Sequence, residues 1–366
     1  MMAQSIPNTI EWNRDGMTVG TLDREAMKAC RERIDNLTKP IYSLAQLEVI
    51  AERLAGIYKE PKPHDLRYGV ILFCADHVGP TSDMAHSLQR VTRFHEGRTA
   101  TQGGASKLKA PVYVVDVGLG CDTSDLSTIA TMPVVKEPRS GEKALSKQEC
   151  QEAIAIGVSW AKRLHEEGIE AVALGHIGEG AYLQALLVTA KVTGVAVDTL
   201  LAAYHKKLEI DNDSTYRDTS VMNETADTID DIVRLAGADI AALVGFVLGA
   251  AACRMAIVFD NAITGAAVVA ATAIEPNVIE YVFPSAAYDD AVHQEQMKYL
   301  QMKPYLYYDV SIDEGLGATM GLSILDASMH MLNDMKTFVE ANVAAAEDGP
   351  GNERQENPDN YKKGKA

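Results

Sequence analysis

The feature that most constrains the fold is a series of short, continuously apolar runs separated by segments of helical length. Strands that are apolar throughout, rather than alternately apolar and polar, are typical of a parallel sheet covered by helices on both faces. We therefore predict an α/β protein with a doubly wound, mostly parallel, Rossmann-like sheet. The expected strands are residues 69–75, 111–117, 170–174, 255–259, 278–283 and 305–310, and the longest expected crossover helices are residues 147–168, 230–254 and 289–300.

The segments at the two ends of the chain predict a second, smaller unit. Residues 44–58 carry apolar side chains at helical spacing, and a further helix is expected from Gly315 towards Val343. We expect both to lie outside the sheet and to form a helical subdomain together. The predicted organisation is an α/β domain at residues 69–310, a helical subdomain from residues 1–68 plus 311–345, and a polar, flexible tail at 346–366.

Charge and cysteine content exclude several classes of function. The 34 Lys and Arg against 51 Asp and Glu give a net charge of −17, which argues against nucleic-acid or anionic-membrane binding. No apolar run reaches the roughly 20 residues of a membrane span, and the N-terminus lacks a signal-peptide pattern. The five cysteines are scattered without metal-ligand spacing, so we expect neither disulfides nor a zinc site, and a cytoplasmic location. No feature calls for a metal or another cofactor.

Acidic residues and glycines follow five of the six expected strands. In open parallel sheets, ligands bind at the carboxyl ends of the strands. Any one of these exits is explained by a turn or a helix cap, but five together predict a ligand site at this edge. The exits are Asp76-His77, Asp116–Gly118, Gly175–Gly180, Asp260-Asn261 and Ser311–Gly315.

Several segments resemble, in order, the motifs of one enzyme family. Residues 40–55 resemble P-x-G-S-L-G-x-L-E-x-L-A-x-x-L-A, Asp76-His77 stands where the family has Asp-His-Gly-Val, and Gln89 aligns with the Gln of V-T-x-Q-M. Residues 235–263 resemble the G-G-x-x-I-A-A-L…D-G-F-I run, and residues 313–318 resemble G-E-G-T-G-A. The closing M-x-T-F…V pattern is matched by Met335, Phe338 and Val343. The chain thus resembles the nicotinate-nucleotide:dimethylbenzimidazole phosphoribosyltransferases (the CobT family) over residues 36–343.

This resemblance implies transfer of the phosphoribosyl group of nicotinate mononucleotide to an aromatic lower-ligand base in cobamide biosynthesis. A neutral azole or phenol needs a base to remove its proton, and the matching carboxylate is Glu314, the candidate catalytic residue. The alternative for Glu314 is an acid at a helix N-terminus. The candidate substrate-binding residues are Asp76, His77, Gln89, Gly175, His176, Gly178, Gly180, Asp290 and His293.

The chain departs from the family where the nucleotide would bind. The family's G-E-M-G-I-G-N-T loop becomes residues 175–182, in which His176 replaces Glu and Glu179 adds a carboxylate that opposes phosphate binding. Residues 200–207 lack the family's G-R-G-T-G segment, and residues 97–102 replace G-G-A-A-I-N. Residues 285–293 keep only one acid and the last histidine of G-H-x-S-x-E-x-G-H.

These departures leave three hypotheses for the function. The favoured one is a degenerate subunit that forms a heterodimer with a homologous chain, as in the two-subunit, phenol-activating branch of the family. The second is an active homodimeric phosphoribosyltransferase with altered base specificity. The third is a protein that binds a cobamide precursor without catalysis. The expected ligands are nicotinate mononucleotide and an aromatic base or phenol.

Overall fold

The structure is a computed structural model that describes residues 12–13, 16–78, 83–135, 137, 139–140, 145–207, 228–307 and 314–343. The tail expected at 346–366 lies outside these residues. The chain divides into two compact units. Unit 1 comprises Met1–Gly20 and Arg67–Leu322, and unit 2 comprises Thr21–Leu66 and Ser323–Ala366, so the boundary falls within helix α12 (Leu316–Asp334).

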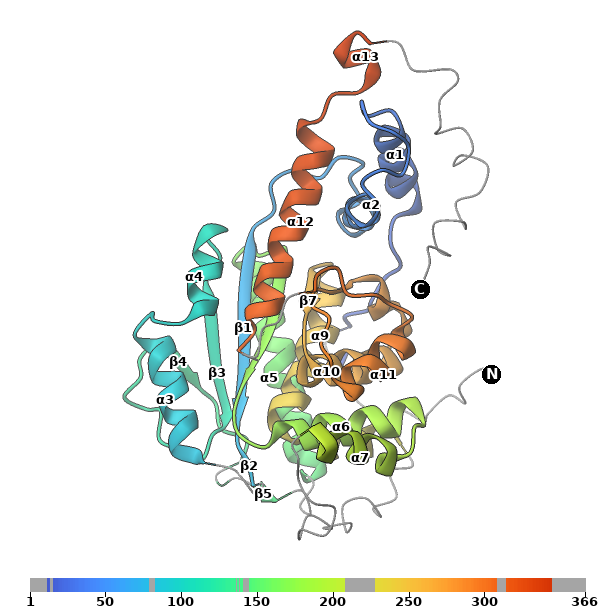
Figure 1. Cartoon of the computed structure of the whole chain (residues 1–366). Coiled ribbons are helices and arrows are strands. Elements are labelled where there is room, and N and C mark those ends of the chain that lie inside the picture. The colour runs from blue at the N-terminus through green and yellow to red at the C-terminus, as the bar shows by residue number, and fades with distance from the viewer. Residues whose placement is uncertain are drawn as a thin grey trace. The chain divides into compact units, whose positions relative to one another are not determined.

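Unit 1 is built on a six-stranded parallel sheet of order β4-β3-β1-β6-β7-β8, which confirms the predicted fold class (Figure 1). The first strand, β1, lies inside the sheet, and β3 and β4 extend the sheet to one edge. The next strand, β6, pairs with the other side of β1, and β7 and β8 extend the sheet to the opposite edge. Ligands in such sheets bind where the strand order reverses, here between β1 and β6. The strands are β1 (Tyr68–Ala75), β3 (Val112–Gly118), β4 (Ile129–Thr131), β6 (Ala171–Ile177), β7 (Ala256–Phe259) and β8 (Val282–Pro284).

The register brings the carboxyl ends of the three central strands level. Cys74, next to the end of β1, lies opposite Asp116 of β3 and Ile177 of β6. All eight residues of β1 are buried, as the continuous apolar run predicts. Just beyond this edge, β2 (His77–Val78) pairs in parallel with β5 (Arg139–Ser140). The loops that leave β1, β3 and β6 are therefore neighbours.

Two of the expected strands are wrong in part. Residues 276–280 form a 3₁₀ helix (η2, Pro276–Glu280), and β8 begins only at Val282. Proline at the first position of η2 fixes a helical φ, and the apolar side chains that follow are buried in either conformation. Residues 305–307 contribute only an isolated bridge, from Leu306 to Ala286, and residues 308–310 lie outside the described residues. The sixth strand is instead β4.

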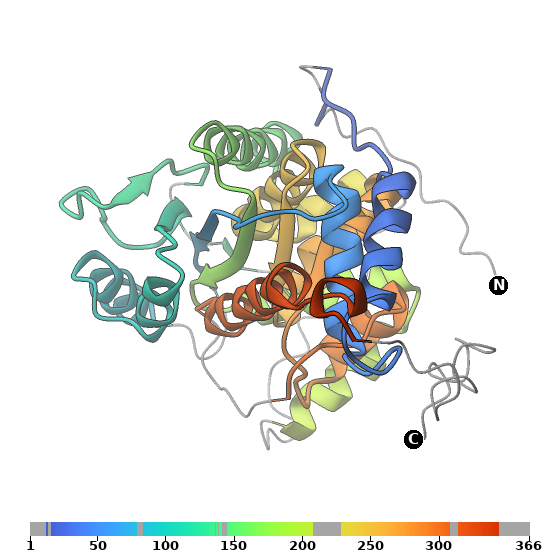
Figure 2. The ribbon, with the colours of Figure 1, turned by 90° about the horizontal axis from the view of Figure 1, so that it is seen from above.

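Helices connect the strands of unit 1. One helix was expected at 230–254, but two are present, because the chain breaks at Gly237 with a φ of +82°. Helices α5 and α9 lie side by side in both views (Figures 1 and 2), and a Cβ on Gly157 of α5 would stand 1.9 Å from the Ala242 carbonyl oxygen of α9. The helices are α3 (Met84–His95), α4 (Ala100–Lys107), α5 (Lys147–Glu166), α6 (Ala181–Thr193), α7 (Val197–Lys207), α8 (Ile229–Leu235), α9 (Gly237–Ala252), α10 (Ala262–Ile274) and α11 (Ala291–Leu300).

Unit 2 is helical, with α1 (Arg24–Asp35), α2 (Gln46–Tyr58), the second part of α12 and α13 (Phe338–Ala341). A buried carboxylate stabilises it: Glu48 Oε2 lies 3.0 Å from Arg31 Nη1, and Glu48 Oε1 lies 2.8 Å from Lys39 Nζ. Buried charges are tolerated when they are paired in this way. Across the described part of the chain, no helix combines the length and hydrophobicity needed to span a membrane.

Candidate active site

Asp76 joins three loops at the carboxyl end of the sheet. Its buried carboxylate accepts hydrogen bonds from the Ser87 hydroxyl (2.5 Å), the Gly120 amide (2.9 Å) and the Glu179 amide (2.9 Å). These donors belong to α3 and to the loops that follow β3 and β6. The three donors satisfy the hydrogen-bonding capacity of this buried carboxylate from three different segments. The contacts of this candidate binding residue therefore hold the site together.

The loop after β6 keeps its glycines because it packs closely against β1. A Cβ on Gly178, whose φ is +155°, would stand 1.8 Å from the Ala75 carbonyl oxygen. The His77 amide donates to the Glu179 carbonyl at 2.8 Å. The Glu179 amide is already bonded to Asp76, so it does not point freely at a ligand as amides do in phosphate-binding loops.

His77, His176 and Asp239 form a buried cluster beneath this loop. Asp239 Oδ1 lies 2.9 Å from His77 Nε2, and Asp239 Oδ2 lies 2.8 Å from His176 Nε2. Burial opposes protonation of His77, but the Asp239 carboxylate outweighs it and raises the pKa of His77. Burial likewise opposes charge on Asp239, yet the charge of His77, its hydrogen bond and the adjacent His176 imidazole hold the pKa of Asp239 below its usual range. The cluster is thus a buried ion pair with a second imidazole against it.

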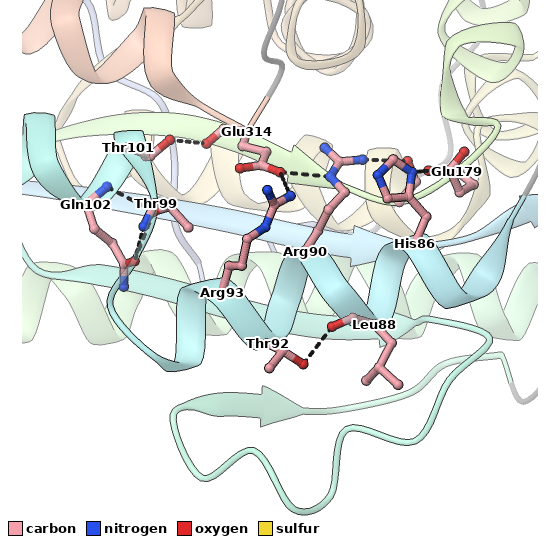
Figure 3. A network of polar contacts seen from close by, with 11 residues as sticks. His86, Leu88, Arg90, Thr92, Arg93, Thr99, Thr101, Gln102, Glu179 and Glu314 are labelled. Carbon is pink, nitrogen blue, oxygen red and sulfur yellow. Dashed lines mark hydrogen bonds and ion pairs between the residues drawn. The ribbon is translucent and has the colours of Figure 1, made fainter.

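Glu314 lies above the end of β6, in a short loop that leads into α12. Gly315 allows this position, because its φ is +74° and a Cβ placed on it would stand only 3.0 Å from the Cα of Gly175 in β6. Thr101 of α4 donates its hydroxyl to the Glu314 carbonyl oxygen at 2.8 Å (Figure 3). The side chain of Glu314 is buried, with 8% of the residue exposed.

Two arginines of α3 neutralise the Glu314 carboxylate. Arg90 Nε donates to Glu314 Oε1 at 2.8 Å, and Arg93 Nη2 lies 3.7 Å from the same oxygen (Figure 3). Arg90 is as buried as Glu314, whereas Arg93 is exposed. His86, one turn before Arg90, places its Nδ1 atom 3.2 Å from Glu179 Oε1. The i, i+4, i+7 spacing puts all three basic side chains on one face of α3, opposite the two acidic loops.

Three further predicted site residues lie away from Glu314: Gln89 is exposed, and Asp290 and His293 are buried near each other. Gln89 is exposed on α3, so it does not join its neighbour Arg90 at Glu314. Asp290 caps α11 by accepting from the His293 amide (2.9 Å) and also accepts from the Tyr182 hydroxyl (2.6 Å). Burial lowers the pKa of His293, whose Nε2 atom lies 3.0 Å from the Ala286 carbonyl oxygen. Asp290 and His293 therefore meet at the start of α11, where Asp290 also contacts Tyr182 of α6.

Some polar strand exits are structural. Asp116 accepts the Gly118 and Leu119 amides at 3.0 and 2.9 Å, and burial raises its pKa. Asn261 caps α10 through the Ile263 and Thr264 amides. Turn and cap formation thus explains these two exits. No arrangement of three or more His, Cys, Asp or Glu residues suited to a metal ion occurs among the described residues.

The sequence analysis missed Arg90, Arg93 and Asp239. Asp239 carried a signal, because it is the one charged residue in the apolar run from 235 to 253. Arg90 carried a weaker signal, because it follows Gln89 where the V-T-x-Q-M motif has methionine. Nothing in the sequence connects Arg90 to Glu314.

Comparison with known proteins identifies the class to which this fold and site belong. A family model described as phosphoribosyltransferase matches residues 19–343. The chain is 31% identical over 341 residues to the nicotinate-nucleotide–dimethylbenzimidazole phosphoribosyltransferase of Chloroflexus aggregans, covering 89% of this chain and 96% of that protein. It is 30% identical to the enzyme of the same name from Acetivibrio thermocellus, covering 88% and 95%. The crystal structure of the Thermus thermophilus enzyme superposes with a TM-score of 0.81 at 25% identity, covering 89% of this chain and all of that one.

The class is therefore that of the phosphoribosyltransferases, which are pentosyltransferases. Within it, the chain belongs to the nicotinate-nucleotide–dimethylbenzimidazole phosphoribosyltransferase family, as a divergent member.

Proposed function

We propose that this chain takes part in phosphoribosyl transfer from nicotinate mononucleotide to an aromatic lower-ligand base of benzimidazole or phenol type. Within that reaction, it serves as the degenerate subunit of a heterodimer with a homologous chain. The names of the relatives support the reaction. The ion pair that Glu314 forms with Arg90 supports the role of a degenerate subunit.

The observation that carries the proposal is the buried ion pair between Arg90 and Glu314. A base in this reaction must accept the proton of the acceptor while the acceptor nitrogen or oxygen bonds to C1′ and nicotinate leaves with the electrons of its glycosidic bond. Glu314 is the candidate base, but its Oε1 atom already accepts from Arg90 at 2.8 Å. Protonating Glu314 would leave the buried guanidinium without its counter-charge, which is costly.

The loop that would hold the phosphate supports the same assignment. Helix N-termini bind phosphate through free amides and the positive end of the helix dipole. Here the Glu179 amide is bonded to Asp76, and the half-buried Glu179 carboxylate lies just before the first turn of α6. A phosphate in this place would meet a like charge and would lose one amide donor. We infer that the nucleotide is bound mainly by the partner's equivalent loop.

The experiment is to purify the chain alone and together with a homologous chain encoded in the same genome. Release of nicotinate from nicotinate mononucleotide is then measured with dimethylbenzimidazole and with phenol as acceptors. The proposal predicts a stable complex whose activity exceeds that of the partner alone, and little activity from this chain alone.

Two results would contradict the proposal. Full activity of the chain alone, abolished by Glu314→Gln, would establish the homodimeric enzyme instead. Binding of a cobamide precursor without nicotinate release, either alone or with a partner, would establish a binding protein. The homodimeric enzyme remains an alternative because Glu314 is present at the candidate site.

A further inference from the structure

We propose that Arg90 is the positioning residue that decides what Glu314 does. It holds one carboxylate oxygen as an ion-pair partner, and this weakens the binding of any acceptor that must donate its N–H to that carboxylate. The inference rests on the proposed function. It assigns to Arg90 the cause of the low catalytic activity that we propose for this chain.

The geometry fixes Arg90 from two directions. Its Nε atom donates to Glu314 Oε1 at 2.8 Å, and its Nη1 atom donates to the Gly178 carbonyl oxygen at 3.4 Å. The guanidinium thus links the β6 loop to the loop before α12. Only 8% of each residue, Arg90 and Glu314, is exposed, so solvent does not screen the pair.

Glu314 is held equally firmly from its own side. The Thr101 hydroxyl donates to its carbonyl oxygen at 2.8 Å, and Gly315 packs directly on Gly175. The carboxylate is therefore presented to α3 by a backbone that is itself fixed. Arg93 adds a second positive charge at 3.7 Å from Oε1 but lies at the exposed edge.

This arrangement has a consequence for the acceptor. A neutral benzimidazole binds a carboxylate by donating the N–H of one ring nitrogen. The same proton must pass to the carboxylate as the other ring nitrogen bonds to C1′ and nicotinate leaves with the electrons of its glycosidic bond. Arg90 already donates to Glu314 Oε1. Its charged guanidinium forms a stronger hydrogen bond to this oxygen than the neutral N–H of a benzimidazole would. Removing the guanidinium should therefore free Glu314 for the acceptor's N–H.

The test is a mutant cycle read out by calorimetric binding of dimethylbenzimidazole to the full chain, without turnover. Arg90→Met replaces the guanidinium by an uncharged side chain of similar length, and Arg90→Lys retains the charge. Glu314→Gln is made in the wild-type and in the Arg90→Met background. Arg163→Met is the matched control, because Arg163, in the last turn of α5, forms an exposed ion pair with Glu167 just after the helix.

Arg90→Met is expected to tighten dimethylbenzimidazole binding about tenfold, the size of one charge-assisted hydrogen bond. The gain should vanish in the Arg90→Met/Glu314→Gln double variant, whereas Glu314→Gln alone, Arg90→Lys and Arg163→Met should bind as the wild type does. A merely structural role for Arg90 would not produce a gain that depends on Glu314.

Three results would overturn the inference. They are weakened binding in Glu314→Gln alone, a gain in Arg90→Met that survives Glu314→Gln, and no measurable binding by folded Arg90→Met protein. Because the readout is binding, it decides the role of Arg90 even if no combination of subunits releases nicotinate, which would contradict the proposed function instead.

Discussion

Arg90 and Glu314 are 224 positions apart in the sequence, yet the Nε atom of the first lies 2.8 Å from a carboxylate oxygen of the second. The pair connects α3 to the loop that opens α12, and both partners are buried. The contact engages one oxygen of the carboxylate that we propose as the candidate base of the reaction. It is the basis for the role that we propose for the chain.

The ion pair should contribute measurably to stability. Arg90→Met leaves a buried carboxylate with only the more distant Arg93, and we expect a loss of about 3 kcal/mol in the free energy of unfolding. Glu314→Gln in the same background should recover a large part of that loss, because no uncompensated charge then remains. Chemical denaturation of the two single variants and the double variant measures the coupling. Additive losses would show that the two side chains do not interact.

Asp76 should be needed for the integrity of the site. Asp76→Ala removes the acceptor of the Ser87 hydroxyl and of the Gly120 and Glu179 amides. We expect a destabilisation of about 3 kcal/mol, because the buried Ser87 hydroxyl and two partly buried amides lose their acceptor. Asp122→Ala is the matched control, since Asp122 is an exposed loop aspartate that accepts from the nearby Ser124 amide, and the melting temperature of this variant should stay close to that of the wild type. Equal melting temperatures for the two variants would contradict this role.

The buried histidine cluster should make stability depend on pH. The pKa of His77 is raised, so its contribution is complete below its unfolded value of about 6.5 and is lost as the pH rises through the folded value. The pKa of Asp239 is lowered, so its contribution is complete above its unfolded value of about 3.9 and is lost as the pH falls through the folded value. The cluster therefore stabilises the fold most between about pH 4 and pH 6.5.

Melting temperatures of the wild type and of Asp239→Asn, measured from about pH 4 to well above pH 6.5, test that expectation. The difference between the two proteins should be largest between about pH 4 and pH 6.5 and should shrink above that interval. A difference that grows steadily towards alkaline pH would contradict the assignment of a charged His77.

Two glycines in helices should respond in opposite ways to alanine. At Gly157, a Cβ would stand 1.9 Å from the Ala242 carbonyl oxygen, so Gly157→Ala must separate α5 from α9 and should cost about 2–3 kcal/mol. At Gly103 in α4, a Cβ meets nothing within 4 Å, so Gly103→Ala should raise stability by about 0.5–1 kcal/mol. Chemical denaturation of both variants is the measurement, and a neutral result at Gly157 would show that the helix contact can relax.

The parallel sheet could be predicted from the sequence because β1, β3, β6 and β7 are apolar on both faces. Apolarity alone did not separate η2 from a strand, since Val278 is buried in the 3₁₀ helix just as it would be in a sheet. Strand β4 was missed because it has only three residues, one of them buried. Whether such a short segment forms a strand depends on its contacts with neighbouring strands rather than on its own hydrophobic pattern.

The candidate site could be predicted only to the level of its location. The acidic and glycine-rich strand ends predicted that residues such as Asp76 and Glu179 lie together, because parallel strands bring their carboxyl ends to the same edge of the sheet. The partners of those residues depend on contacts between distant segments, such as Arg90 with Glu314 or Asp239 with His77 and His176. Charge pairing of this kind has no local sequence signal.

The most direct test of the account is the rate of nicotinate release by the complex of this chain with its homologous partner, compared between wild-type and Glu314→Gln versions of this chain. We predict rates that agree within about twofold, because Glu314 is held by Arg90 and removes no proton. Loss of a general base typically lowers the rate by about 10²–10⁴-fold. A loss of that size on substituting Glu314 in this chain would contradict the account.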